Sequence, residues 1–165
     1  MRPPPEEATI PLPALEPDEL NQVLRYFNAA RRALGPVPAQ VHLEALGDAL
    51  FHASEYLIAY GSLAPGQANH HQVANLGGTW REGWVYGSLE RAGWASALGY
   101  LALRWTPTGA PVPAQLLHSP DLPAHWVSLD AFEGPGYRRI LAPFFDRHGV
   151  VAVGNVYVAA SSTGG

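Results

Sequence analysis

The chain has 165 residues, of which 47% are hydrophobic, so it can bury one sizeable core and is too apolar to be disordered throughout. It contains no cysteine, which excludes disulfides, thiolate catalysis and cysteine-ligated metals and favours a cytoplasmic location. The net charge is −4, and the ten basic residues, all arginines, form no stripe, so nucleic-acid binding is not expected. No apolar run reaches the length of a signal peptide or a membrane span, so no membrane partner is expected.

Residues 1–52 are predicted to form a flexible arm followed by a two-helix extension. The arm, residues 1–16, is rich in proline and acidic residues, a composition that disfavours a packed structure. A first helix is predicted to begin at Pro17, with acids at its start and arginines near its end as the helix dipole prefers, and Gly35-Pro36 stops it. Its inward face carries apolar residues at helical spacing: Leu20, Leu24, Phe27 and Leu34.

A second helix, predicted from Ala39 to about His52, completes the extension. Its apolar residues are expected to face inward: Val41, Leu46, Ala49 and Leu50. The helical part of the extension, residues 18–52, is a candidate docking surface or dimer contact, and the chain is expected to act as a monomer or a homodimer.

The remaining residues are predicted to form one domain at residues 53–160, followed by a tail at 161–165. Short aromatic and aliphatic runs between glycine- and proline-rich turns predict five strands, at residues 55–60, 79–89, 97–105, 137–145 and 150–159. One inserted helix is predicted at residues 124–132. Because few helices separate the strands, a doubly wound parallel sheet is not expected. The pattern favours an α+β domain with five or six strands in a mainly antiparallel, barrel-like sheet.

The tetrapeptide YGSL occurs twice, at residues 60–63 and 86–89. The sequences that follow the two copies differ, which indicates two strands of one sheet rather than repeated domains. In the first copy a buried strand ends at Tyr60, and Gly61 lets a ligand approach the backbone closely. Successive amides of Gly61, Ser62 and Leu63 could then hold an oxyanion or a carboxylate. An ordinary strand-ending turn is the alternative, and neither copy fits the Gly-x-Ser-x-Gly nucleophile elbow.

A second candidate group lies in LDAFEGPGYRR, residues 129–139. Glu133 falls in the last turn of the predicted helix, where the helix dipole disfavours a charged carboxyl, and the neighbours Phe132 and Tyr137 would exclude water. Both effects raise a carboxyl pKa toward neutrality, which suits an acid–base group. The alternative is a solvated glutamate before a capping glycine. Asp130 is expected to form an ion pair with Arg138 or Arg139.

The seven histidines show no metal-ligand spacing such as His-Glu-x-x-His, so a structural or exposed role is expected for them. We therefore predict no metal site and no cofactor. His70 and the preceding Asn69 follow the first YGSL copy, where a contact with a substrate is an open alternative.

Three segments together resemble the gamma-glutamylcyclotransferase-like family: AYGSLAPGQANHH, LDAFEGPGYRR and the closing GNVYVA strand. The family pattern is Tyr-Gly-Ser/Thr-Leu-x-x-Gly after a strand, then Leu-Asp-x-x-Glu-Gly followed by Tyr-x-Arg. All pieces occur here in order, over residues 55–160. The resemblance implies a small mixed barrel in which residues 60–63 cradle the substrate, Glu133 is the catalytic acid/base and Tyr137 lines the pocket. The second YGSL copy would then build the barrel wall.

The resemblance also implies a reaction, the conversion of a small γ-glutamyl amide or peptide to 5-oxoproline and a free amine. The α-amine of the substrate would attack its own γ-carbonyl, with a glutamate as general acid/base. The sequence departs from the family pattern at Trp94-Ala95, where many members have an aromatic-proline pair. The shape of the pocket rim, and with it the identity of the substrate, is therefore not predicted. A non-catalytic small-acid-binding or interaction protein on the same fold is the alternative.

Overall fold

The computed structural model describes residues 12–34, 37–91 and 101–160. The helices are α1 (Pro17–Ala33), α2 (Val37–Phe51) and α3 (Trp126–Glu133). The strands are β1 (Tyr56–Ala59), β2 (Thr79–Glu90), β3 (Ala102–Trp105), β4 (Ala110–His118), β5 (Tyr137–Asp146) and β6 (Gly149–Ala159). Several features predicted from sequence lie outside the described residues: most of the arm, the Gly35-Pro36 stop, Trp94-Ala95 and the tail.

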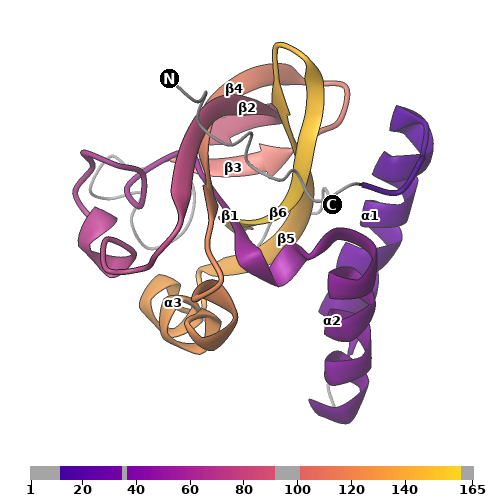
Figure 1. Ribbon diagram of the computed structural model, residues 1–165, viewed down its shortest axis with the longest axis horizontal. Helices are drawn as coiled ribbons and strands as arrows, with labels where there is room; N and C mark the ends of the chain where they lie inside the picture. The colour runs from indigo at the N-terminus through magenta and orange to yellow at the C-terminus, as the bar shows by residue number, and fades with distance from the viewer. Residues whose placement is uncertain (1–11, 35–36, 92–100, 161–165) are drawn as a thin grey trace, which may run out of the picture.

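The strands form one sheet that closes on itself into a barrel (Figure 1). The strand order is β1-β4-β2-β3-β6-β5, and further pairings of β1 with β6 and of β2 with β5 close it. Strand β6 runs parallel to β1 and β3, whereas the other pairs are antiparallel. This confirms the predicted α+β class with a small mixed, mainly antiparallel barrel. The inserted helix is α3, between β4 and β5, and α1 and α2 lie beside the barrel (Figure 1).

Strand β4 was not among the strands predicted from sequence, because it contains Pro111 and Pro113. Proline has no N–H to donate to a sheet and is therefore typical of strand edges. Along its whole length β4 pairs with β2, but β1 joins on the other side only from Gln115 onward. Both prolines thus lie in the half of β4 that has a neighbour on one side, where a missing donor costs little.

Helix α1 packs onto the barrel with three of the four residues predicted for its inward face, while Leu34 follows the helix as its cap and is half-buried. Leu20, Leu24 and Phe27 are buried and belong to the same core cluster as residues of the barrel strands. Asn28, on the same helix, is 1% exposed. Its amide nitrogen donates to the carbonyl oxygen of Leu141 in β5 at 2.9 Å, and its amide oxygen accepts from the Leu141 N–H at 2.8 Å. The Asn28 side chain therefore makes the two backbone hydrogen bonds with Leu141 that a neighbouring strand would otherwise make.

The inward face predicted for α2 is wrong. Val41, Leu46 and Leu50 are 60%, 52% and 36% exposed, and Ala49 is exposed as well. The helix instead turns Gly47 and Phe51 toward the protein, and Phe51 is 1% exposed.

Close packing and two carboxylates explain this orientation of α2. The ring of Phe27 lies 3.0 Å from the position of a Cβ on Gly47, so the two helices come close together at a residue without a side chain. Glu44 forms a two-pronged ion pair with Arg31 of α1, at 2.8 Å for each contact. The carboxylate of Asp48 accepts from the backbone N–H of Ser54 at 2.8 Å. The spacing of apolar residues within α2 could not predict this orientation, because the polar partners of Glu44 and Asp48 lie outside the helix.

The two YGSL copies differ in the space around their glycines. Gly87, in β2, lies so close to β3 that an added Cβ would overlap the carbonyl oxygen of Arg104. Gly61 has no atom within 4 Å of the corresponding position. Strand packing therefore requires the glycine of the second copy, while the glycine of the first copy borders open space.

We expect Gly87→Ala to lower the free energy of unfolding by about 1–3 kcal/mol, the usual cost of overpacking. The overlap is with backbone, which cannot rotate away as a side chain could. Urea denaturation followed by circular dichroism measures the effect, and Ser88→Ala, at the exposed neighbour, is the control, with a change of about 0.5 kcal/mol or less. Equal stability of Gly87→Ala and the parent chain would contradict the close approach of β2 and β3.

Candidate active site

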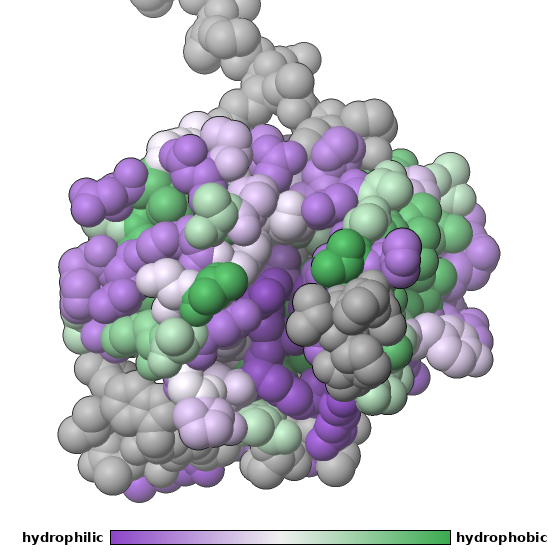
Figure 2. Space-filling model, turned by 90° about the horizontal axis from the view of Figure 1, so that it is seen from below, coloured by the Kyte–Doolittle hydropathy of each residue, from purple (hydrophilic) through white to green (hydrophobic). Residues whose placement is uncertain are grey.

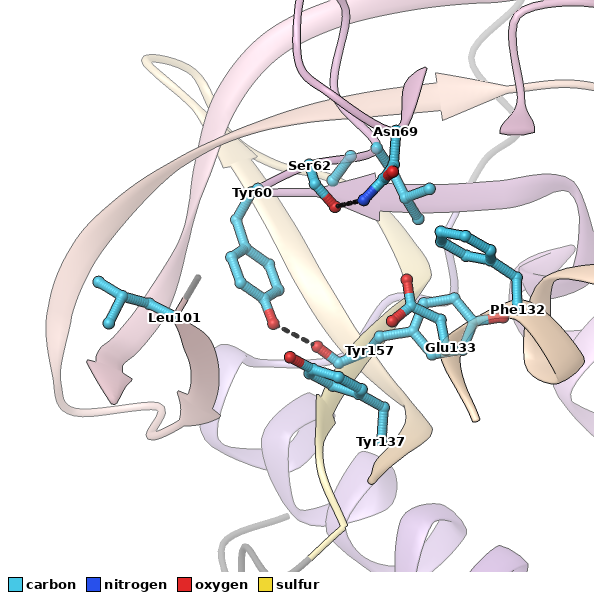
Figure 3. Close-up of a pocket in the computed structure, with 11 residues that line it drawn as sticks. Tyr60, Ser62, Asn69, Leu101, Phe132, Glu133, Tyr137 and Tyr157 are labelled. Atoms are coloured by element: carbon cyan, nitrogen blue, oxygen red, sulfur yellow. Dashed lines mark hydrogen bonds between the residues drawn. The ribbon is translucent and has the colours of Figure 1, made fainter. Parts of the chain in front are cut away.

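A pocket of about 80 Å³ lies at the end of β1, between the loop that follows this strand and the carboxyl end of α3 (Figure 3). The six residues predicted from sequence as site residues all line it: Tyr60, Gly61, Ser62, Leu63, Glu133 and Tyr137. The fold thus brings together two segments that are 70 residues apart in the chain.

The first YGSL copy forms a turn whose carbonyl groups are occupied by hydrogen bonds. The carbonyl oxygen of Gly61 accepts from Ala64 N–H at 3.1 Å, and that of Ser62 accepts from Asn69 N–H at 2.8 Å. Asn69 also donates from its side chain to the Ser62 hydroxyl at 2.9 Å (Figure 3). Among the described residues, the amide N–H groups of Gly61, Ser62 and Leu63 donate to no other backbone group.

Tyr60 joins the turn to the barrel. Its hydroxyl donates to the carbonyl oxygen of Tyr157 in β6 at 2.7 Å and accepts from the N–H of Leu103 in β3 at 2.9 Å. Burial, the largest cause, raises the pKa of Tyr60 far above its usual value, so the phenol stays neutral. The hydroxyl thus donates to one backbone group and accepts from another, which ties Tyr60 to β6 and β3. The ring of Tyr60 forms part of the pocket wall.

Glu133 lies in the last turn of α3, as the sequence predicted, and is its last residue, one beyond the predicted helix end at Phe132. Its carboxylate points toward the side of the pocket where Ser62 and Asn69 lie (Figure 3). The helix ends there because Gly134 adopts φ +75°, a conformation that favours glycine. Burial raises the pKa of Glu133 to about 7, with the negative charge of Asp130 as the second cause. A carboxyl with this pKa is present in both protonation states near neutral pH and can accept and return a proton.

Asp130 lies one helical turn before Glu133 and forms the predicted ion pair with Arg139. Arg139 contacts both carboxylate oxygens, at 3.0 and 3.1 Å. The hydroxyl of Tyr157 also donates to Asp130, at 2.7 Å. Three donors thus hold the Asp130 carboxylate in place, and its negative charge disfavours ionisation of Glu133.

Five further residues line the pocket. Asn69 had been left as an open alternative for a substrate contact, and the other four were not predicted as site residues: Ala59, Leu101, Phe132 and Tyr157. Tyr157 reaches the pocket because β6 pairs with β5, which places it opposite Arg139. That register depends on the closed barrel and leaves no local signal in the sequence. Phe132 was expected near Glu133 to exclude water, and its place in the pocket wall agrees with this.

Within the described ranges, no group of three or more histidine, aspartate or glutamate side chains could hold a metal ion. In the same part of the chain, no helix has both the length and the apolar character needed to cross a membrane.

Known proteins resemble this chain, although no curated protein matches it in sequence. Among solved structures, YkqA from Bacillus subtilis is similar, with 20% identity and a TM-score of 0.49, covering 64% of this chain and 35% of that one. This chain therefore spans about a third of YkqA. An AIG2-like protein from Mus musculus is also similar, with 21% identity and a TM-score of 0.47, covering 66% of this chain and 79% of that one. The model of the family described as "Gamma-glutamyl cyclotransferase, AIG2-like" matches residues 57–164, and the chain belongs to this family.

Proposed function

We propose that the protein is a gamma-glutamylcyclotransferase that converts a small γ-glutamyl amide or peptide to 5-oxoproline and a free amine. One observation carries the proposal: a carboxyl with a pKa of about 7, Glu133, shares a pocket with the turn of residues 61–63, whose amide groups are the proposed donors. Family membership supports the same reaction class. In the proposal Tyr60 and Tyr137 line the pocket, and the reaction uses no cofactor.

The substrate carries both reacting groups, so the protein has to fold it into a ring-closing conformation. The α-amine attacks the γ-carbonyl carbon, a new C–N bond forms, and the amine nitrogen loses a proton to Glu133. The tetrahedral intermediate then collapses, and the bond between the γ-carbon and the leaving nitrogen breaks. Glu133 returns its proton to that nitrogen, so that the carboxylate is regenerated and no water is consumed.

The turn after β1 would bind the glutamyl end of the substrate. Backbone N–H groups that converge on one point stabilise a negative oxygen without reorganisation, whether it is the developing oxyanion or the α-carboxylate. The hydrogen bonds from Asn69 to Ser62 hold this turn in place before the substrate arrives. The open space beside Gly61 admits a ligand close to the backbone.

The proposal is tested by incubating the purified protein with a panel of γ-glutamyl amides and γ-glutamyl dipeptides. Mass spectrometry then detects 5-oxoproline and the released amine in equal amounts. We expect turnover of at least one member of the panel. Saturable binding of 5-oxoproline without turnover of any panel member would reject the enzyme and favour the small-acid-binding alternative.

The fall in rate on the acid side of the pH–rate profile should reflect protonation of Glu133. The reaction needs the carboxylate form, so kcat/KM is expected to fall as the pH drops below about 7, where Glu133 becomes protonated. Asp130→Asn removes a negative charge that raises the pKa of Glu133, so the acid limb should move to lower pH by about half a pH unit.

Asp146→Asn is the matched control for this shift. Asp146 also pairs with an arginine, Arg81, at 2.9 Å, but it lies at the far end of β5. Its loss should leave the acid limb in place. A limb that moves to higher pH in Asp130→Asn, or that moves equally in both variants, would contradict the assignment to Glu133.

A further inference from the structure

A chain of polar contacts connects the helical extension to the back of the proposed active site. Its members are, in order of contact, Glu44 of α2, Arg31 of α1, Asn155 of β6, Arg139 of β5 and Asp130 of α3. The four charged members also line a hollow between the extension and the barrel. In Figure 2, the face on the side of α3 and the lower ends of α1 and α2 is hollowed along a strongly hydrophilic furrow.

Asn155 lies at the centre of this chain and is buried. Its amide oxygen accepts from Arg31 at 3.1 Å and from Arg139 at 2.9 Å, while its amide nitrogen donates to the carbonyl oxygen of Ala53 at 2.7 Å. Arg31 also donates to the backbone carbonyl oxygen of Arg139, at 3.1 Å. A residue of the extension therefore contacts both the backbone of Arg139 and the amide oxygen to which the Arg139 side chain is bonded.

The charges of the chain of contacts are balanced in two pairs, Arg31 with Glu44 and Arg139 with Asp130, each through two contacts. Only 13% of the Arg31 side chain is exposed, so its charge depends on these neighbours. Loss of Arg31 would leave Glu44 without this partner. Glu44 would then compete with Asp130 for Arg139, because all three line the same hollow.

Asp130 connects the chain of contacts to Glu133. It lies one helical turn before Glu133, and after burial its charge is the second cause of the raised pKa of that residue. The other titratable groups among the described residues of the pocket are tyrosines from the end of β1, from β5 and from β6: Tyr60, Tyr137 and Tyr157. Burial raises the pKa of each tyrosine, so all three are neutral near pH 7. A change at Arg139 therefore reaches Glu133 through the charge of Asp130.

We propose that Arg31, in the helical extension, is a positioning residue of the active site. It holds Arg139 in place on Asp130, and it thereby limits the effect of the Asp130 charge on Glu133. The proposal rests on the proposed function, in which Glu133 carries the proton. Helix α1 precedes the matched family region, whereas Asp130 and Arg139 lie inside it. In this proposal the extension completes the site in addition to covering the barrel.

An NMR titration of the full chain, isotope-labelled at the glutamate side-chain carboxyl carbons, measures the pKa of Glu133 without any substrate. The Glu133 signal is identified by its loss in Glu133→Gln. In Arg31→Gln we expect the pKa of Glu133 to rise by about half a pH unit, because Arg139 then neutralises Asp130 less completely. Arg31→Lys keeps the charge but not the paired donors, so it should cause a smaller rise.

Two comparisons check the route of this effect. In an Asp130→Asn background, Arg31→Gln should cause no further change in the pKa of Glu133, because the charge through which Arg31 acts is gone. Arg25→Gln removes an equal charge from an exposed position on the same helix and should leave the pKa of Glu133 unchanged. An equal rise in Arg25→Gln, or a rise that persists in the Asp130→Asn background, would overturn the proposal.

Circular dichroism of each variant checks that the fold is kept. No rise in Arg31→Gln would overturn the proposal, and if that variant does not fold, no rise in Arg31→Lys would do so. The titration also separates the positioning role from the proposed reaction. If the expected shifts occur but no γ-glutamyl substrate is converted, the reaction is wrong and the positioning role stands. If the parent chain is active and Arg31→Gln changes neither the pKa of Glu133 nor the acid side of the pH–rate profile, the positioning role is wrong and the reaction stands.

Discussion

Glu133→Gln is expected to lose turnover of γ-glutamyl substrates by about a hundredfold or more, the usual contribution of a general acid–base group. Glutamine has nearly the same shape but cannot accept a proton from the attacking amine or return one to the leaving nitrogen. The loss should appear in kcat, because the amide donors of residues 61–63 that would bind the substrate are unchanged. The measurement is the rate of 5-oxoproline release at pH 7.5 and saturating substrate.

Glu19→Gln is the control for this prediction, since Glu19 is an exposed acid in the first turn of α1. It should keep the parent rate. The thermal transition of Glu133→Gln should be no lower than that of the parent, because a neutral side chain suits a partly buried position better than a carboxylate does. A Gln variant with the parent rate would remove Glu133 from the mechanism and leave the pocket as a binding site.

Leu24→Ala is expected to lower the free energy of unfolding by about 2–5 kcal/mol, the range for a large-to-small change in a packed core. Leu24 is 0% exposed and belongs to the core cluster of the barrel, although α1 precedes the matched family region. For a domain of marginal stability, such a loss removes a large part of the total. Guanidinium denaturation measured by tryptophan fluorescence gives the value.

Tyr26→Ala is the comparison on the same helix, because Tyr26 is 70% exposed. It should change the free energy of unfolding by about 0.5 kcal/mol or less. A similar small effect for Leu24→Ala would mean that α1 detaches from the barrel in solution.

Much of the fold could be predicted from the sequence because it depends on local patterns. The strand before the first YGSL copy, α1 and the end of α3 at Glu133 follow from apolar periodicity and from glycine punctuation. The family resemblance, which rested on three segments, is confirmed by the family match over residues 57–164. It also explains why the six predicted site residues, from two distant segments, line one pocket.

The failures all concern partners that are distant in sequence. The orientation of α2 depends on two contacts with α1 that its apolar pattern does not reveal. Arg31 pairs with Glu44, and the ring of Phe27 packs closely against Gly47. Strand β4 is stable despite its prolines because β1 covers only part of it. Tyr157 reaches the pocket through a register that the closed barrel sets. The periodicity of apolar residues within one helix or strand does not predict such contacts between distant segments.

The paired hydrogen bonds between Asn28 and Leu141 bear on how shortened versions of the protein should be made. A fragment cut at the family boundary would leave the N–H and the carbonyl oxygen of Leu141 without their amide partner and would expose the apolar surface that α1 covers. Such surfaces drive aggregation during expression. Fragments for crystallisation or for fusion to other proteins should therefore start upstream of Pro17, where the natural cover of the barrel is retained.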